Sequence, residues 1–171
     1  EYLVGCTLNG SIILWECTMD FAFHTRILGH AWDVICLAKL NFNNTDKYLL
    51  SGGNFTEIKV WDIDLECIKT LTSDTGTVYV SKIITFNHDE KEYFARFSSD
   101  KTLTVWDAID FVALFTLTGH HGDIMQNSST YNNGKLFIIS SNSDGDIFVW
   151  DFKARNMSVS ISINVRACYP R

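Results

Sequence analysis

Short β-branched runs separated by turn residues set the hydrophobic pattern of the chain. In its clearest stretch the pattern predicts strands at about 77 to 86, 92 to 98, 102 to 107 and 112 to 117. No segment keeps apolar residues at i, i+3, i+4 and i+7 long enough to predict a helix. Further along, Asn133-Gly134 predicts a hairpin, because both residues tolerate the positive φ of a type I′ turn. The pattern therefore predicts an all-β chain.

A tryptophan closes one β-branched run in every period of the chain. The four periodic tryptophans are Trp15, Trp61, Trp106 and Trp150, with spacings of 46, 45 and 44 residues, and an acidic residue follows each. Gly29-His30 and Gly119-His120 follow the first and third of them, whereas the same place after Trp61 reads Ser73-Asp74. Each period has room for four short strands, and such a unit must stack on its neighbours to bury both faces.

Gly-His, a turn Asp and a β-branched run ending in Trp-Asp at this period resemble the WD40 repeat. The resemblance implies an all-β, WD40-type β-propeller with about four four-stranded antiparallel blades, forming a partial ring. The expected WD40 region is 1-164, with a partial blade 1 at 1-28, blade 2 at 29-72, blade 3 at 73-118, blade 4 at 119-164 and a tail at 165-171. The stretch Trp-Asp-Ile-Asp-Leu-Glu-Cys at 61 to 67 is most similar to WD repeats of RING-type ubiquitin ligases and myosin heavy chain kinases.

In the WD40 family a His, a Ser or Thr, a turn Asp and the Trp form a hydrogen-bonded set that locks each blade. Carried over by position, the resemblance implies these structural residues: His30, Ser51 and Trp61; Asp100 and Trp106; His120, Ser140, Asp144 and Trp150. The last repeat alone has the full set. The other repeats depart from it at Phe55, Asp74, Arg96, Asn9 and Gly5.

The resemblance also sorts the loops by face. In a four-stranded meander, the loop leading into the first strand and the turn between the second and third strands emerge on one face, which often receives peptides in this family. The expected partner-binding residues there are Trp32, Asp33, Asn54, Thr75, Ser99, His121 and Ser143. Trp32 is the expected centre, because it lies outside the periodic set and an exposed Trp is a favoured interface anchor. The alternative for Trp32 is packing over the neighbouring blade.

The amino-acid composition argues against several classes of binding site. A net charge of −6 over 171 residues disfavours a nucleic-acid or anionic-membrane surface. The dispersed cysteines suggest neither a zinc site nor a disulfide framework, so we expect a reducing, cytoplasmic location, with the nucleus as the alternative.

Ser140, His120 and Asp144 are also the residue types of a hydrolase triad, but Ser140 falls inside a predicted strand. The pair His120-His121 lacks a third metal ligand at a suitable spacing. We therefore expect no catalytic residues, no metal and no cofactor.

These observations together predict a non-catalytic scaffold or adaptor that presents a propeller surface to a protein or peptide. The rival prediction is the substrate-recognition segment of a larger enzyme, a ubiquitin ligase or a kinase, whose catalytic domain lies outside this chain. The first strand aligns with the second strand of a blade, so we expect either a longer propeller or self-association with another copy.

Overall fold

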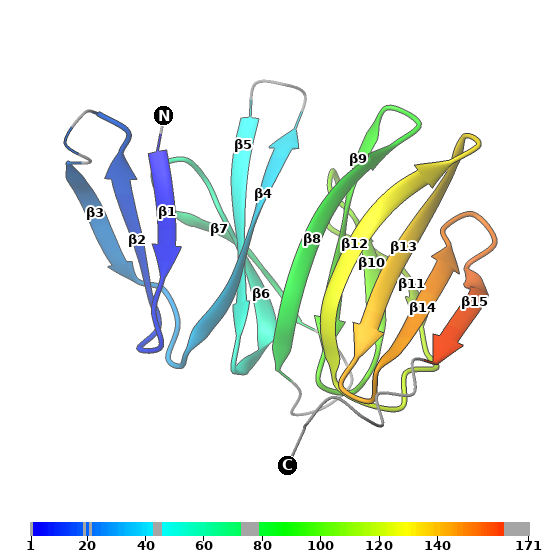
Figure 1. The fold of residues 1–171 in the computed structure, drawn as a ribbon. Coiled ribbons are helices and arrows are strands. Elements are labelled where there is room, and N and C mark those ends of the chain that lie inside the picture. Colours follow the sequence, from blue (N-terminus) through cyan, green and yellow to red (C-terminus); the bar gives the residue numbers. More distant parts are fainter. Residues whose placement is uncertain (1, 19, 21, 43–45, 73–78, 163–171) are drawn as a thin grey trace, which may run out of the picture.

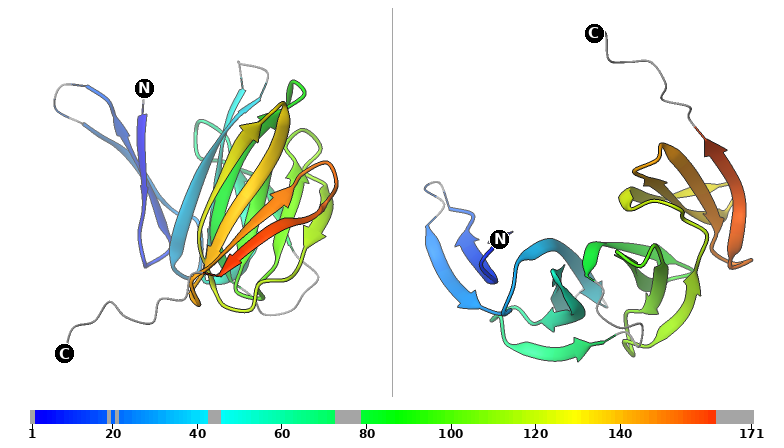
Figure 2. Two further views of the ribbon diagram at one scale, coloured as in Figure 1. Left: turned by 45° about the vertical axis from the view of Figure 1, so that its right-hand side comes forward. Right: turned by 90° about the horizontal axis from the view of Figure 1, so that it is seen from below.

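The computed structural model describes residues 2–18, 20, 22–42, 46–72 and 79–162. These residues form fifteen strands in four antiparallel sheets, with no helix among them. The predicted all-β architecture is confirmed. The sheets stand side by side in chain order (Figure 1), and the view from below shows them curving in an arc around an open centre (Figure 2).

The first sheet has three strands and each of the others has four, paired in sequence order. Sheet 1 consists of β1 (Tyr2–Cys6), β2 (Ser11–Glu16) and β3 (Phe23–Leu28). Sheet 2 consists of β4 (Val34–Phe42), β5 (Asp46–Gly53), β6 (Phe55–Trp61) and β7 (Cys67–Leu71). Sheet 3 consists of β8 (Val80–His88), β9 (Lys91–Ser98), β10 (Leu103–Asp107) and β11 (Ala113–Leu117). Sheet 4 consists of β12 (Ile124–Asn132), β13 (Lys135–Asn142), β14 (Asp146–Asp151) and β15 (Asn156–Ser162).

Local turn chemistry explains where the strands end. The hairpin predicted at Asn133-Gly134 joins β12 to β13, with φ of 48° and 75° at its two residues. Asp89 and Glu90 make the equivalent turn between β8 and β9, also with positive φ. The four strands predicted in sheet 3 correspond to β8 to β11, with shifts of at most three residues at their ends. Residues 77 and 78 of the first predicted strand lie outside the described part of the chain.

Apolar side chains fill the space between successive sheets. Sheets 3 and 4 share a core that includes Phe97, Val105 and Ile138, all fully buried. Sheets 2 and 3 share a second core around Leu50 and Phe94. The core between sheets 1 and 2 is smaller. Stacking of neighbouring sheets is therefore what buries the β-branched runs seen in the sequence.

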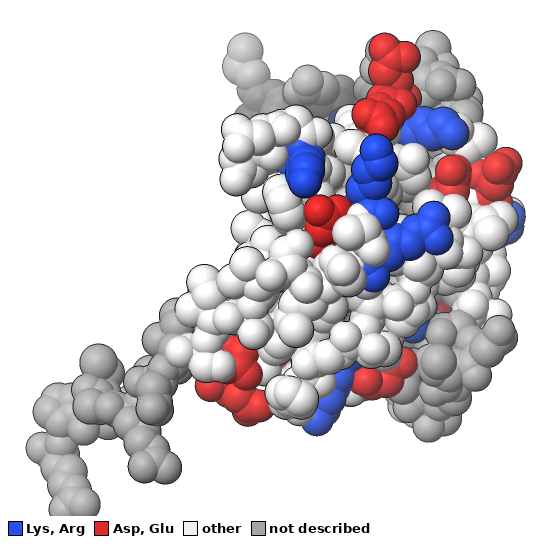
Figure 3. All heavy atoms as spheres, turned by 90° about the vertical axis from the view of Figure 1, so that its right-hand side faces the viewer, with Lys and Arg blue, Asp and Glu red and all other residues white. Residues whose placement is uncertain are grey.

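One side of the arc ends in a strand that nothing covers in the described structure. Every residue of β15 is exposed, and its sequence, Asn-Met-Ser-Val-Ser-Ile-Ser, contains no charged residue. Seen from the side on which β15 lies, the molecule shows a broad region free of Lys, Arg, Asp and Glu (Figure 3).

Candidate functional site

A buried hydrogen-bonded group centres on a serine in sheet 4. The Ser140 hydroxyl accepts a hydrogen bond from Trp150 Nε1 at 2.9 Å and shares another with His120 Nε2 at 2.7 Å. All three residues are at most 5% exposed. Burial lowers the pKa of His120 from 6.5 to about 4, so the ring is neutral at pH 7. The group fastens the loop before β12 to β13 and β14.

Sheet 2 repeats this arrangement with a different neighbour for the histidine. Ser51 Oγ accepts from Trp61 Nε1 at 2.7 Å and lies 2.6 Å from His30 Nε2. The His30 ring stacks on Phe55, with centroids 4.0 Å apart. Burial and the positive charge of Lys59 lower the His30 pKa to about 4. Since His30 is then neutral at pH 7, the Glu57 carboxylate 3.8 Å from its Nδ1 does not form a charged pair with it.

The turn Asp that the resemblance assigned to the last lock stands apart from the histidine. Asp144 is exposed, and its carboxylate lies beside Gly122, where an added Cβ would come within 2.7 Å of Oδ2. His120 Nδ1 has no hydrogen-bond partner among the described residues. The lock in sheet 4 therefore consists of His120, Ser140 and Trp150.

Sheet 3 has a different buried polar residue at the serine position. Arg96 is 2% exposed there, and its pKa is lowered by burial while the Asp100 charge acts in the opposite direction. Trp106 stacks on Phe94, but its Nε1 has no hydrogen-bond partner in the described structure. Asp100 accepts from the Thr102 backbone N–H at 3.0 Å and from its hydroxyl at 2.6 Å, which shapes the turn before β10. Asp74 lies outside the described residues.

Sheet 1 also departs from the lock. Gly5 occupies the serine position, and a Cβ there would come within 3.0 Å of the Trp15 ring. Asn9, at the turn-Asp position, accepts a hydrogen bond from the Ser11 hydroxyl at 3.0 Å. Sheet 1 therefore brings the Trp15 ring against its own backbone, where sheets 2 and 4 place a serine hydroxyl.

The described residues of the loops expected to form a binding face lie at one end of the sheets, the lower end in Figure 1. In three sheets, the loop leading into the first strand is joined to the turn between the second and third strands. The Asn54 backbone N–H donates to the Asp33 carbonyl at 3.0 Å, and its side chain donates to the Asp33 carboxylate at 2.9 Å. The Ser143 N–H donates to the Asp123 carbonyl at 2.8 Å, and Ser143 Oγ accepts from the Asp123 N–H at 3.2 Å. We call this end the leading-loop face.

Sheet 3 makes the same junction through a residue that the sequence did not single out. The Ser99 N–H donates to the Tyr79 carbonyl at 3.1 Å, and the Tyr79 N–H donates to Ser99 Oγ at 3.1 Å. Only the backbone of Tyr79 takes part, so no side-chain motif marks it. Thr75 lies outside the described residues. Lys101 Nζ donates to the His121 carbonyl, which ties the turn of sheet 3 to the leading loop of sheet 4.

Trp32 projects from the leading loop of sheet 2. Its side chain is 68% exposed, so it does not pack over the neighbouring sheet. Its backbone packs closely against Gly10 in the β1–β2 turn. The contact is so close that a Cβ on Gly10 would collide with the carbonyl groups of His30 and Trp32. His30 on one side of Trp32 and Val34 on the other are buried. An exposed aromatic side chain is thus mounted on a fixed backbone.

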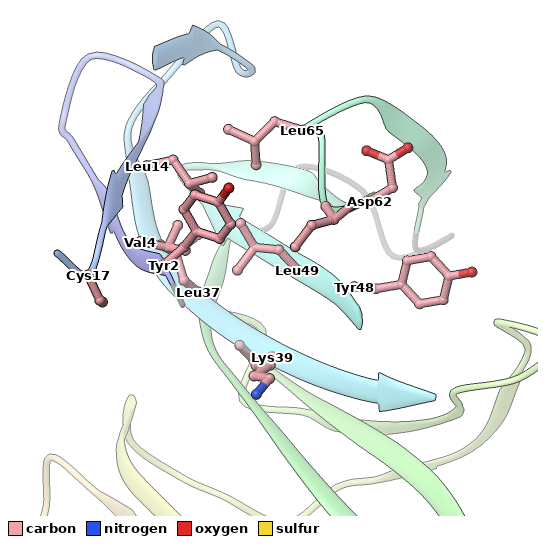
Figure 4. A pocket seen from close by; sticks show the side chains of 12 residues that line it. Tyr2, Val4, Leu14, Cys17, Leu37, Lys39, Tyr48, Leu49, Asp62 and Leu65 are labelled. Carbon is pink, nitrogen blue, oxygen red and sulfur yellow. The ribbon is translucent and has the colours of Figure 1, made fainter. Parts of the chain in front are cut away.

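A cleft opens between sheets 1 and 2. Its volume is about 590 Å³, and apolar residues from both sheets line it together with Lys39 and Asp62 (Figure 4). Within the described part of the chain, no group of three His, Cys, Asp or Glu side chains could hold a metal ion. The same part contains no helix long and apolar enough to cross a membrane.

Comparison with known proteins agrees with the stacked sheets and the Ser-His-Trp locks. Residues 22–62 and 111–151 match the model of the WD domain, G-beta repeat. Both segments are WD40 repeats. This confirms the resemblance to WD40 repeats and the fold class that it implied.

The relatives are longer proteins with varied names. The chain is 27% identical over 156 residues to "Transcriptional corepressor LEUNIG_HOMOLOG" of Arabidopsis thaliana, covering 89% of this chain and 19% of that protein. It is 26% identical over 155 residues to "Pre-mRNA-processing factor 17" of Mus musculus, covering 88% and 25%. A "Nuclear distribution protein PAC1" from Candida dubliniensis is 27% identical over 153 residues, covering 82% and 28%. The chain thus spans about a fifth to a quarter of the first two.

Proposed function

We propose that this WD40 chain is a non-catalytic interaction module that binds a peptide segment of a protein partner on the leading-loop face, with Trp32 at the centre. The observation that carries the proposal is a Trp side chain 68% exposed on a loop whose flanking residues are buried. A rigid aromatic anchor gives contact area at low entropic cost, which is why exposed Trp residues are often interface hot spots. WD40 relatives named as a corepressor and a pre-mRNA-processing factor support a role in protein assemblies.

The junctions between loops support the same proposal. Asp33 with Asn54, and Asp123 with Ser143, hold neighbouring loops in fixed positions, so one partner can contact several sheets without ordering the loops first. Asp123 is exposed and adds negative charge to the face. The partner segment is therefore neutral or basic rather than acidic or phosphorylated. Ser99 and His121 extend the contact region over sheets 3 and 4, as does Thr75 by its place in the sequence.

A peptide selection tests the proposal directly. Peptides selected from a random display library on the intact chain should be rich in Lys and Arg, and Trp32→Ala should weaken their binding about tenfold or more. Phe23→Ala is the matched control, because Phe23 is 63% exposed on β3, outside the leading loops, and should leave affinity unchanged. Thermal unfolding should be the same for both variants. Peptides that bind Trp32→Ala as well as the unchanged chain would refute the proposal.

We propose that this role is carried out in the cytoplasm or the nucleus. The four described cysteines, Cys6, Cys17, Cys36 and Cys67, are free thiols, which suits a reducing compartment. The same binding face would also serve a substrate-recognition segment of a larger ubiquitin ligase or kinase. The full open reading frame distinguishes the two: a RING or kinase domain beside these repeats would favour the enzyme, and further WD repeats alone would favour the scaffold.

A further inference from the structure

Sheets 2, 3 and 4 share an irregularity at the start of their inner strands. These strands, β4, β8 and β12, lie nearest the open centre of the arc (Figure 2), and each has a β-bulge within its first three residues. The extra residues of the three bulges are Ile35, Ser81 and Met125. A bulge re-aims the side chain of its extra residue, and bulges are frequent next to functional sites.

Apolar side chains are exposed at these bulges. Ile35 is 40% and Met125 is 59% exposed. In sheet 3 the Ser81 hydroxyl donates to the Phe97 carbonyl at 3.0 Å, but Tyr79, two residues earlier, is 40% exposed. We call Ile35, Tyr79 and Met125 the inner rim, which belongs to the leading-loop face because Tyr79 makes the loop junction of sheet 3. All three sheets have four strands, so the inner rim is not exposed for want of a strand.

Contacts between the inner strands hold the inner rim in place. The Cys36 thiol donates to the Val80 carbonyl at 3.8 Å, which joins the starts of β4 and β8. Lys82 Nζ donates to Gln126 Oε1 at 3.0 Å, which joins β8 to β12. Cys36, Val80 and Gln126 are direct sequence neighbours of the three rim residues. The rim side chains therefore stand on strands that are already fixed against one another, so a partner need not order them on binding.

Carboxylates accompany the exposed apolar residues of the rim. Asp33 and Asp123 stand two residues before the bulge residues of sheets 2 and 4. Neither carboxylate forms an ion pair with a described residue. The ammonium groups of Lys82 and Lys101 are already bound to oxygen acceptors of sheet 4. Two sheets thus present an apolar side chain together with an unpaired negative charge, which suits a partner that is both apolar and basic.

We propose that the inner rim selects a partner segment with two pairs of residues, each pair an apolar side chain beside a Lys or Arg. One apolar side chain packs on Ile35 and Tyr79, and its basic neighbour pairs with Asp33. The other packs on Met125, and its basic neighbour pairs with Asp123. The inference rests on the proposed function, because it requires that a peptide segment binds the leading-loop face. It adds the chemistry that distinguishes this segment from other peptides.

Peptide selection on rim variants tests the apolar part of the inference. From a random-sequence display library, the intact chain should select peptides with Leu, Ile, Met or Phe next to Lys or Arg. The double variant Ile35→Ser/Met125→Ser should bind these peptides about tenfold or more weakly, and in a fresh selection it should lose the apolar preference but keep the basic one. Ile68→Ser is the matched control, because Ile68 is 46% exposed on β7, and it should change neither result. Both variants should unfold at the same temperature as the unchanged chain.

Asp123→Asn tests the charged part. The junction of Asp123 with Ser143 uses only the backbone of Asp123, so the substitution leaves the loop in place. The selected peptides should bind this variant about threefold or more weakly, and their binding should depend less on salt concentration. An unchanged salt dependence would overturn the pairing with the partner's basic residues.

The outcomes separate this inference from the proposed function. The inference is overturned if selected peptides show no apolar preference, or if they bind the double variant as well as the unchanged chain. If Trp32→Ala still weakens binding in that case, the proposed function survives, whereas peptides that also bind Trp32→Ala unchanged would refute both. A double variant that unfolds at a lower temperature would show that the chain itself covers the inner rim, which also overturns the inference.

Discussion

The rings of His30 and Phe55 stack with centroids 4.0 Å apart and planes 15° apart. Phe55 stands six residues before Trp61, where the last repeat has Asp144 six residues before Trp150. In sheet 2 the buried histidine therefore stacks on an apolar ring. In sheet 4 the ring of His120 packs against the rings of Phe148 and Trp150. In both sheets the serine hydroxyl is the polar partner that the histidine and tryptophan share.

Replacing a periodic tryptophan should cost more stability in a sheet that has this serine than in the sheet that lacks it. Trp150→Phe removes the hydrogen bond to Ser140, whereas Trp106→Phe removes a ring nitrogen without a partner among the described residues. Both lose similar ring area, so Trp150→Phe should cost about 1 kcal/mol more in unfolding free energy. Denaturant midpoints measure the difference. Equal losses would show that the Trp150 hydrogen bond adds nothing to stability.

Within sheet 4, replacing His120 should lower the free energy of unfolding far more than replacing Asp144. His120→Ala leaves a cavity beside Trp150 and removes a partner of buried Ser140, so it should cost about 2 kcal/mol or more. Asp144 is exposed and, in the described structure, makes no hydrogen bond to His120, so Asp144→Ala should cost under about 1 kcal/mol. Urea unfolding of the two variants checks this. A larger loss of unfolding free energy for Asp144→Ala than for His120→Ala would show that Asp144 belongs to the lock.

Acid should destabilise the fold through its two buried histidines. The pKa of each falls from 6.5 in the unfolded chain to about 4 in the folded one. The unfolded state therefore binds protons first as pH drops, so stability is fully present above pH 6.5 and is lost toward pH 4, by about 1.4 kcal/mol per pH unit for each histidine.

The pH dependence can be assigned to these residues by substitution. Unfolding free energies measured between pH 7.5 and 4.5 should show a shallower slope for His30→Gln. His24→Gln, which replaces an exposed histidine on β3, is the control substitution. A slope that stays unchanged in His30→Gln would mean that other groups cause the acid sensitivity.

The uncharged β15 edge should make the chain self-associate. Ile161 is 50% and Val159 is 49% exposed on this strand, and flat, uncharged edge strands pair with other chains. Light scattering at tens of micromolar should therefore show species larger than a monomer. Ile161→Lys should reduce them, whereas Ile109→Lys, at a similarly exposed loop position, should not. A monodisperse monomer that stays stable on storage would contradict this expectation.

The sequence predicted the repeat and its strands because both depend on local patterns. The tryptophan spacing and the β-branched runs located the strands of sheet 3, and Asn133-Gly134 located a hairpin. The sequence did not predict that Asp144 would stand away from His120, because that depends on how the turn closes over Gly122. It also missed the backbone junction of Tyr79 and the cleft beside β1, which arise from loop geometry and sheet stacking rather than from residue type.

The junctions of Asp33 with Asn54, Tyr79 with Ser99, and Asp123 with Ser143 each join a loop to a turn of its own sheet. The loops of sheets 2 and 4 are also tied to the preceding sheet, because Gly10 bonds to His30 and Lys101 bonds to His121. A designer who wished to exchange a leading loop between repeats would therefore move it together with its own turn and with the turn of the repeat before it. Gene duplication that copies two consecutive repeats would carry all of these contacts along, whereas the insertion of a single repeat would have to match them again.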